Sequence, residues 1–230
     1  MRSRSKDYAA EADEVLRIAR RLKPDARSVL DVACGTGLHL QYFTKLFDRA
    51  VGLDRSEDML RFAQDRIPGL PVRCAEMSRF ELDESFDVIT CMFAIPHLRS
   101  PAELDAMVDC LMRHLTAGGV VIIESWFAPE EFLPGYVATD LITDGDRKIF
   151  RVSHSVRRGD QAEMVVHYVE ADPASGIQHY TEHDRMTLFT REHYKTAFAR
   201  ARCDTEYLEN TPFERGLWVA QRVDVSEARR

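Results

Sequence analysis

Apolar runs of strand length alternate with amphipathic segments of helical length through the first half of this sequence. The runs are nearly continuous in apolar residues, and the segments between them repeat apolar residues every three or four positions. Strands of this kind are buried on both faces and are joined by crossover helices, so we expect a parallel sheet covered on both sides. The predicted strands are 28–33, 50–54, 71–77, 86–93 and 119–125, and the predicted helices are 5–22, 37–47, 56–67 and 100–115.

After Trp126 the pattern changes to β-like segments joined by the turn signals "DGD", "RRGD" and "DPASG". These signals predict an antiparallel meander inserted at residues 127–187. The helical segment "TREHYKTAFARAR" and the strand-like "DTEYLEN" and "GLWVAQR" then complete the first architecture. Ser56 and Thr190 are the expected N-caps of the helices that follow them, and Glu192 lies near the third position of the second of these helices. We therefore expect an α/β fold: a Rossmann-like, mostly parallel seven-stranded sheet in residues 1–126 and 188–230, with an inserted antiparallel β meander.

Composition and charge narrow the classes of function. The 230 residues are 45% hydrophobic and 30% charged, which is typical of a globular protein. The net charge of −7 argues against a nucleic-acid partner, and no apolar run is long enough to cross a membrane. The five cysteines are odd in number and lack CxxC pairing, so they indicate buried small side chains in a reducing cytoplasm. We expect a cytoplasmic protein with no metal.

The stretch "LDVACGTGLHL" joins the first predicted strand to a helix through two glycines. Gly35 and Gly37 would let a ligand approach the backbone, where the helix N-terminus offers N–H groups. A dinucleotide motif needs a third glycine at position 40, which is Leu40, and no P-loop lysine is present. Asp54, at the end of the second predicted strand, can accept both ribose hydroxyls of a nucleoside. A nucleoside without a phosphate is therefore predicted, and S-adenosylmethionine (SAM) fits.

At this point the chain resembles a known family. "VLDVACGTG" and "GLDRSEDML" are similar to motifs I and II of class I SAM-dependent methyltransferases. "MFAIPHL", "RVSHSVR", "VHYVEADPASGIQHY" and "ERGLWV" further resemble the nucleotide-sugar N,N-dimethyltransferases, which finish deoxyamino sugars such as desosamine and mycaminose in macrolide pathways. The resemblance covers about residues 6–219. It implies SAM as cofactor and a nucleotide sugar as the small-molecule acceptor.

The cofactor contacts follow from these motifs and from the resemblance. Asp31 would reach the methionine ammonium, and Tyr8 would cover the SAM carboxylate. The family holds adenine through an acid before a methionine; here that acid is Glu76, one methylene longer than the usual aspartate, so the backbone at Met77 is the firmer expectation. The other expected cofactor residues are Ala33, Gly35, Gly37, Asp54, Arg55 and Met92.

His97 is the candidate catalytic residue. It follows the fourth predicted strand, and the carboxyl ends of strands in an open sheet border the ligand crevice. A histidine suits the removal of a proton from an ammonium near neutral pH. The matching histidine of the resembled enzymes lies near the substrate amine in a "GHL" context, whereas Pro96 precedes it here. A purely structural histidine is the alternative.

Four residues of the predicted strand "RVSHSVR" alternate and so share one face. This face carries two cations and two hydroxyls, which could bind a pyrophosphate, although a solvated sheet face is an equal alternative. The expected acceptor-site residues are Arg151, Ser153, Ser155 and Arg157 on this strand, together with Phe93 and Arg215.

The reaction expected is N-methylation, twice on one nitrogen, of an amino sugar attached to a nucleoside diphosphate. Methylation of another small natural product at nitrogen or oxygen and a non-catalytic SAM-binding protein remain open, while a dehydrogenase is disfavoured by Leu40. The resembled enzymes carry further N-terminal residues, so either the start codon is placed late or an active-site lid is absent. An exposed edge of the meander predicts a homodimer.

Overall fold

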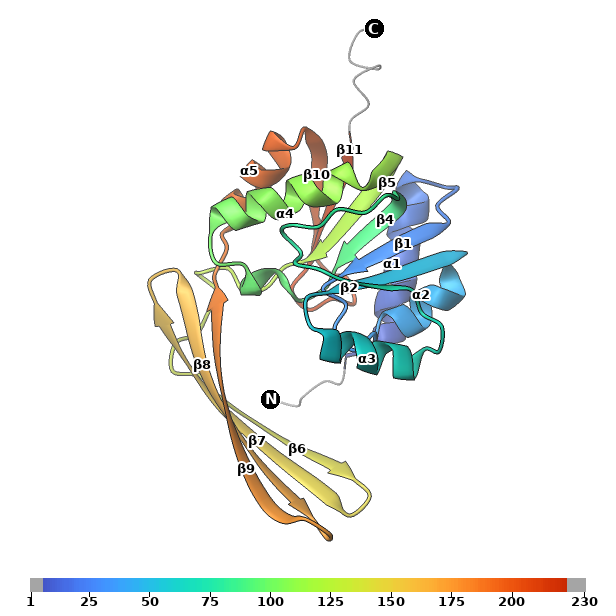
Figure 1. The fold of residues 1–230 in the computed structure, drawn as a ribbon. Coiled ribbons are helices and arrows are strands. Elements are labelled where there is room, and N and C mark those ends of the chain that lie inside the picture. The colour runs from blue at the N-terminus through green and yellow to red at the C-terminus, as the bar shows by residue number, and fades with distance from the viewer. Residues whose placement is uncertain (1–5, 223–230) are drawn as a thin grey trace, which may run out of the picture. The chain divides into compact units, whose positions relative to one another are not determined.

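The computed structural model describes residues 6–222, which form two compact units. Of the described residues, 6–126 and 190–222 belong to the larger unit, and 127–189 belong to the smaller one. Figure 1 labels the elements of both units along the chain.

The larger unit contains a seven-stranded sheet with the order β10-β11-β5-β4-β1-β2-β3. Strands β1 to β5 pair in parallel, and β11 is antiparallel to both β5 and β10. This arrangement confirms the predicted mostly parallel sheet. The strands are β1 (Ser28–Val32), β2 (Arg49–Asp54), β3 (Val72–Cys74), β4 (Phe86–Cys91), β5 (Leu115–Glu124), β10 (Cys203–Leu208) and β11 (Leu217–Arg222).

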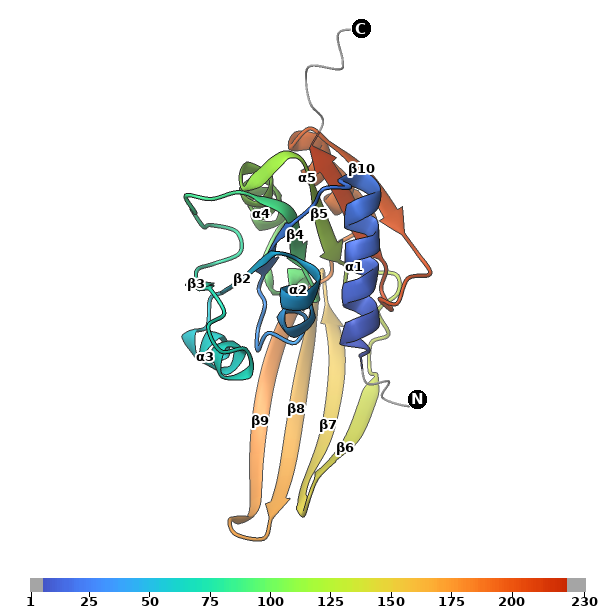
Figure 2. The ribbon, with the colours of Figure 1, turned by 90° about the vertical axis from the view of Figure 1, so that its right-hand side faces the viewer.

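Helices cover both faces of this sheet, with α1 and α2 on one face and α4 and α5 on the other (Figures 1 and 2). Alternate residues of the central strands separate in the same way: Val120 and Ile122 of β5 join the cluster of α1 and α2, whereas Val121 and Ile123 are buried on the opposite face. The helices are α1 (Tyr8–Leu22), α2 (Leu40–Leu46), α3 (Glu57–Arg66), the short 3₁₀ helix η1 (Ile95–His97), α4 (Pro101–Arg113) and α5 (Arg191–Arg200).

Capping side chains determine where three of these helices begin. The hydroxyls of Ser56, Ser100 and Thr190 each accept a hydrogen bond from a backbone N–H in the first turn of their helix. At α5 the side chain that completes the capping box is His193, rather than the neighbouring Glu192 that the sequence suggested. The N-caps expected at Ser56 and Thr190 are confirmed.

Several predicted elements are shorter in the structure, and the expectation that the cysteines are buried is partly wrong. Strand β3 ends at Cys74, because the chain turns back in a bridge between Glu76 and Arg79. Helix α2 begins at Leu40 instead of residue 37, after a series of turns. All five cysteines are free thiols, but only Cys91 and Cys110 are buried. Cys34 and Cys203 are half-buried, and Cys74 is exposed on edge strand β3.

The smaller unit contains a four-stranded antiparallel sheet with the order β6-β7-β8-β9. Each strand pairs with the next one along the chain, so the predicted meander is confirmed. Its strands are β6 (Val137–Asp144), β7 (Arg147–Arg158), β8 (Gln161–Asp172) and β9 (Gly176–Thr187).

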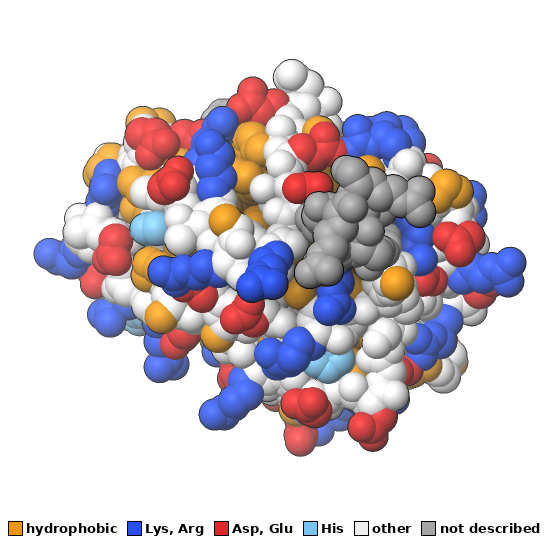
Figure 3. All heavy atoms as spheres, turned by 90° about the horizontal axis from the view of Figure 1, so that it is seen from above, with side chains coloured by type: hydrophobic (Ala, Val, Ile, Leu, Met, Phe, Trp, Pro, Cys, Tyr) orange, Lys and Arg blue, Asp and Glu red, His pale blue; other side chains and the backbone are white. Residues whose placement is uncertain are grey.

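The surface carries both signs of charge. On the face seen in Figure 3, lysine and arginine side chains are interspersed with aspartate and glutamate. Between Lys6 and Arg222, no helix combines the length and the apolar character that a membrane crossing requires.

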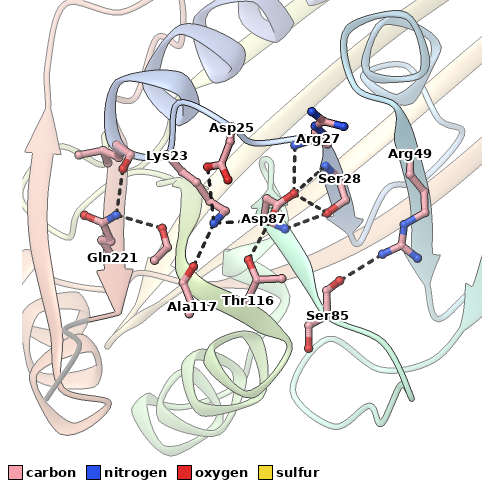
Figure 4. A network of polar contacts seen from close by, with 12 residues as sticks. Lys23, Asp25, Arg27, Ser28, Arg49, Ser85, Asp87, Thr116, Ala117 and Gln221 are labelled. Carbon is pink, nitrogen blue, oxygen red and sulfur yellow. Dashed lines mark hydrogen bonds and ion pairs between the residues drawn. The ribbon is translucent and has the colours of Figure 1, made fainter. Parts of the chain in front are cut away.

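A polar network connects the amino ends of β1, β4 and β5 (Figure 4). The Asp87 carboxylate accepts hydrogen bonds from the backbone N–H groups of Arg27 (3.0 Å) and Ser28 (3.1 Å) and from the hydroxyls of Ser28 (2.9 Å) and Thr116 (2.9 Å). Burial by itself would raise the pKa of Asp87, but these hydrogen bonds outweigh it and lower the pKa. The ionised carboxylate therefore stabilises the folded sheet at this edge.

We expect Asp87→Asn to lower the free energy of unfolding by about 1–3 kcal/mol at pH 7, because charge-assisted hydrogen bonds at a partly buried site are lost. The pKa of Asp87 in the folded protein lies below the value of about 3.9 in the unfolded chain. The stabilisation by the Asp87 carboxylate is therefore fully present above the unfolded pKa and is lost as the pH falls through the folded pKa. Urea unfolding at pH 7 and pH 3 measures both effects. Asp25→Asn, whose side chain is 80% exposed, is the control. Equal destabilisation by both substitutions would contradict the role of Asp87.

Candidate cofactor and active site

The candidate site lies at the carboxyl edge of the seven-stranded sheet, opposite the Asp87 network. Strand β1 has β2 on one side and β4 on the other, so the connections leave β1 and β4 in opposite directions. At such a switch point the loops separate and form a crevice beyond the strand ends. Asp31 and Asp54, at the ends of β1 and β2, both belong to this edge.

The loop that follows β1 adopts backbone conformations that L-residues rarely populate. The φ angles are +57° at Ala33, +54° at Gly35 and +76° at Gly37. A strained non-glycine residue such as Ala33 persists only where the surroundings hold it, and such positions cluster at functional sites. The surroundings of Gly35 and Gly37 differ. A Cβ atom on Gly35 would meet nothing within 4 Å, whereas one on Gly37 would lie 3.0 Å from the Cβ of Ala63 in α3.

Gly35 therefore borders open space that a ligand can use, while Gly37 allows α3 to pack against the loop. The cofactor role of Gly37 stays a prediction, and the packing against Ala63 is a second requirement for glycine at this position. The open space at Gly35 fits the approach of a cofactor to the backbone.

The Asp54 carboxylate holds this loop in place. Its Oδ2 atom accepts a hydrogen bond from the Gly35 N–H (2.9 Å), and its Oδ1 atom accepts one from the Ser56 N–H (2.9 Å). Asp54 is 9% exposed, so the expected strand-end carboxylate is largely buried and also bridges two loops. A carboxylate offers about four acceptor positions, which leaves roughly two for ribose hydroxyls.

The Asp31 carboxylate is buried at the end of β1, with 2% of its surface exposed. Thr90 of β4 donates a hydrogen bond to Oδ1 at 2.7 Å. Burial raises the pKa of Asp31 to about 6, although His39 and the Thr90 hydrogen bond act in the opposite direction. A nearby cation stabilises the charged form of a buried carboxylate of this kind. The ammonium group of the methionine part of SAM would be such a cation.

A cluster of buried charges adjoins Asp31, and sequence reasoning did not single it out. Lys6 Nζ lies 2.7 Å from Oε2 of Glu124 and 3.4 Å from Oε2 of Glu11. The same Glu11 oxygen lies 2.7 Å from Nε2 of His39. We call these four residues, Lys6, Glu11, His39 and Glu124, the charge cluster. The available signals were the lysine of "KDYAAEA" and a glutamate ending an apolar strand, but their pairing spans 118 positions.

Aromatic rings surround the charge cluster. The Tyr8 ring contacts the His39 ring edge-on, with 4.9 Å between centroids, and burial raises the pKa of Tyr8. Lys6 Nζ lies 5.3 Å from the centroid of Phe93 and 5.7 Å from that of Phe213. Phe93 has a strained backbone, with φ +57°, and its side chain is 48% exposed, so this backbone conformation holds the ring at the surface of the site. Tyr8 and Phe93, both expected site residues, thus adjoin the same cluster.

The other expected cofactor residues differ in exposure. Met92 is buried at the end of β4, and Met77 is half-buried in the turn after β3. Arg55 and Glu76 are exposed, and the carbonyl of Arg55 accepts a weak hydrogen bond from the Cys74 thiol. His97 is exposed at the end of η1, and its backbone N–H donates a hydrogen bond to the carbonyl of Ala94.

The expected acceptor residues are distributed over both units. In the smaller unit, Ser153 and Ser155 are buried, and Arg151 forms an ion pair with Asp140 at 3.4 Å. Arg157 donates hydrogen bonds to the carbonyls of Gly159 (2.8 Å) and Pro129 (2.7 Å). The four-residue face is therefore not uniformly solvated, since its hydroxyls are buried and its cations contact neighbouring groups.

Arg215 belongs to the larger unit, in the loop before β11. Its carbonyl accepts hydrogen bonds from the hydroxyls of Ser125 (2.6 Å) and Tyr207 (2.7 Å). The backbone of this loop is thus fastened to the end of β5 and to β10.

Comparisons with known proteins agree with this architecture. Residues 29–119 match a family model described as a methyltransferase domain. The chain is 43% identical over 217 residues to dTDP-3-amino-3,4,6-trideoxy-alpha-D-glucopyranose N,N-dimethyltransferase of Streptomyces venezuelae, covering 94% of this chain and 92% of that protein. The crystal structure of Streptomyces venezuelae DesVI matches with a TM-score of 0.91 and 42% identity, over 95% of this chain and 93% of that one.

A third match carries the cofactor. SAM-bound CalS10, an amino pentose methyltransferase from Micromonospora echinaspora involved in calicheamicin biosynthesis, matches with a TM-score of 0.88 and 39% identity, over 96% of this chain and 93% of that one. The fold, the glycine loop and the two strand-end carboxylates define a class I SAM-dependent methyltransferase. Because the similarity at 43% identity extends through nearly the whole chain, the protein belongs to the dTDP-amino-sugar N,N-dimethyltransferases.

Gly35→Ala and Gly37→Ala separate ligand approach from packing. Both place a side chain at positive φ, which costs about 1–2 kcal/mol, but only the Gly37 variant adds a 3.0 Å contact to Ala63. We expect Gly35→Ala to weaken SAM binding about ten-fold or more with a small loss in melting temperature, because its Cβ enters the open space. Gly37→Ala should lose more melting temperature. Calorimetric titration with SAM and thermal unfolding measure the two effects. Wild-type SAM affinity in Gly35→Ala would contradict the assignment.

Proposed function

We propose that the protein transfers methyl groups from SAM to the amino nitrogen of a nucleotide-linked deoxyamino sugar, twice on the same nitrogen. The observation that carries this proposal is the 43% identity over 94% of the chain to an enzyme named for that reaction. The similarity includes the four-stranded sheet of the smaller unit as well as the methyltransferase domain at residues 29–119. A general methyltransferase domain alone would support the reaction type and leave the acceptor open.

The residues at the carboxyl edge fit the cofactor. The open space beside Gly35 accepts its approach, the remaining acceptor positions of Asp54 suit ribose hydroxyls, and buried Asp31 suits an ammonium group. Tyr8, Ala33, Arg55, Glu76, Met77 and Met92 complete the proposed contacts. When bound, SAM supplies a methyl group on a sulfonium, which is already a strong electrophile.

The protein has little covalent chemistry to perform, so its residues align the acceptor nitrogen and exclude water. The nitrogen must also be unprotonated. We assign His97 as the group that accepts the ammonium proton, because this exposed residue ends η1 at the carboxyl edge of the sheet. Phe93, strained and partly exposed on the neighbouring loop, is assigned to the acceptor side of the site.

For the nucleotide part of the acceptor, we assign Arg151, Ser153, Ser155 and Arg157 of the smaller unit. Arg215 of the larger unit is a separate proposed acceptor residue. Alternation along β7 places the first four side chains on one face of the sheet, where guanidinium and hydroxyl groups can bind phosphate oxygens. The ion pair of Arg151 with Asp140 is 3.4 Å long, which leaves this guanidinium able to exchange partners.

Incubation of the protein with SAM and a panel of dTDP-amino sugars tests the acceptor. Mass spectrometry should find the mass of one and then two methyl groups added to the sugar, with S-adenosylhomocysteine as coproduct. The dTDP-sugars with a hydroxyl in place of the amine are the matched controls and should stay unmodified. Binding of SAM without any product would indicate a non-catalytic protein, and methylation of the hydroxyl controls would indicate an O-methyltransferase.

In the same assay, His97→Asn should lower turnover by about ten- to a thousand-fold, the range for loss of a general base. The loss should diminish as the pH rises, because more of the amine is then unprotonated in solution. His114→Asn is unsuitable as a control, since that buried ring is hydrogen-bonded at both nitrogens; exposed His154→Asn is the matched surface variant. An unchanged rate across the pH range would limit His97 to orienting the acceptor.

We further propose that the enzyme is a cytoplasmic homodimer joined through the smaller unit. Leu141, Phe150 and Val169 are exposed large apolar side chains that lie in register across β6, β7 and β8, so they form one apolar row. Light scattering after gel filtration should give twice the chain mass for the wild type and the chain mass for Phe150→Glu. Ile142→Glu, on the opposite face of β6, is the control. A monomeric wild type would refute the dimer.

A further inference from the structure

The charge cluster holds two carboxylates and one ammonium in a region with little access to water. Glu124 is 1% exposed and Glu11 is 2% exposed, whereas the Lys6 side chain is 27% exposed. Buried carboxylates are costly unless a cation compensates them, and the only lysine or arginine within 4.0 Å of either among the described residues is Lys6. Burial raises the pKa of Glu124, and Lys6 acts against this rise. One ammonium therefore lies within 4.0 Å of two buried carboxylates.

The position of Lys6 connects three elements of the site. Lys6 precedes α1, Glu124 ends β5, and Phe93 lies in the loop after β4, with its ring 5.3 Å from the ammonium. The Glu11 carboxylate extends the contacts to His39, which lies directly before α2 and contacts the Tyr8 ring. Any movement of Lys6 would therefore act on Phe93 directly and on Tyr8 through Glu11 and His39.

We propose that Lys6 is a positioning residue. Its ammonium is held by Glu124 and Glu11 against the ring of Phe93, and it fastens the start of α1 across the carboxyl edge of the sheet. Lys6 thereby places Tyr8 and Phe93 beside the methionine end of the SAM site. This inference rests on the proposed function, because it takes the Asp31 side of the edge as the place of the methionine group. It adds residues outside the glycine loop and the strand-end carboxylates to those that determine SAM affinity.

The same helix provides a matched control at its other end. Arg21, in the last turn of α1, forms an ion pair with Glu206 of β10, and both side chains are more than 40% exposed. Exposed pairs contribute about 0–1 kcal/mol. Arg21→Met therefore removes a long cation and an ion pair from α1 without leaving a buried carboxylate uncompensated.

We expect Lys6→Met to weaken SAM binding about ten- to a hundred-fold, as misplacement of site residues can do. The weakening should depend on pH. Without the ammonium, the pKa of Glu124 rises further, so Glu124 takes up a proton as the pH falls, and the cluster loses the negative charge that favours a cationic ligand. The SAM dissociation constant of Lys6→Met should therefore increase from pH 8 to pH 6 relative to that of the wild type.

Two further variants separate positioning from general destabilisation. Lys6→Arg keeps the charge and should retain most of the SAM affinity. Lys6→Met/Glu124→Gln removes the cation and its principal carboxylate together, so it should regain melting temperature relative to Lys6→Met and lose most of the pH dependence. Isothermal titration with SAM at pH 6, 7 and 8, and thermal unfolding without ligand, are measured for all variants.

The proposal is overturned if Lys6→Met binds SAM as the wild type and Arg21→Met do at all three pH values. It is also overturned if affinity falls equally at each pH and the double variant restores nothing, since Lys6 would then act by supporting the fold alone. Failure of the wild type to bind SAM would instead refute the proposed function, and that outcome is distinguishable because it appears before any substitution is made.

Discussion

The hydrogen bonding of β1 on both sides to parallel strands is the constraint on which the rest of the larger unit depends. With β2 on one side and β4 on the other, the two connections diverge, and the carboxyl ends of β1 and β4 are left open between them. Every group assigned to the cofactor lies at the carboxyl end of a strand, in a loop that begins at this edge or in the start of α1. The same pairing buries the sheet on both faces, which makes the strands nearly continuous in apolar residues.

Carboxylates at the two edges of the sheet illustrate how environment determines their chemistry. Asp87 at the amino edge accepts four hydrogen bonds, and its pKa is lowered, so it is a structural anion. Asp31 at the carboxyl edge receives one from a hydroxyl, and burial raises its pKa to about 6. A site whose buried acids are incompletely compensated is suited to a cationic ligand, and SAM carries both a sulfonium and an ammonium.

Local patterns predicted much of the fold and the first part of the site. The apolar runs led to the parallel strands, the turn signals led to the meander, and Ser56 and Thr190 were recognisable as caps, because each of these depends on neighbouring residues alone. The glycine loop and Asp54 were predicted to lie together, and a 2.9 Å hydrogen bond joins them. The length of β3 was overestimated, because the bridge between Glu76 and Arg79 leaves no trace in hydropathy.

By itself, the sequence determined the class of fold, the glycine loop between the first strand and the next helix, and the family, since these follow from periodicity and short motifs. Tertiary structure alone decided that Gly37 packs against Ala63, that Asp54 bridges two loops and that Lys6 compensates Glu124. The physical reason is that burial and charge compensation are properties of neighbours in space. Lys6 and Glu124 are 118 positions apart, and only the folding of α1 along the sheet makes them neighbours.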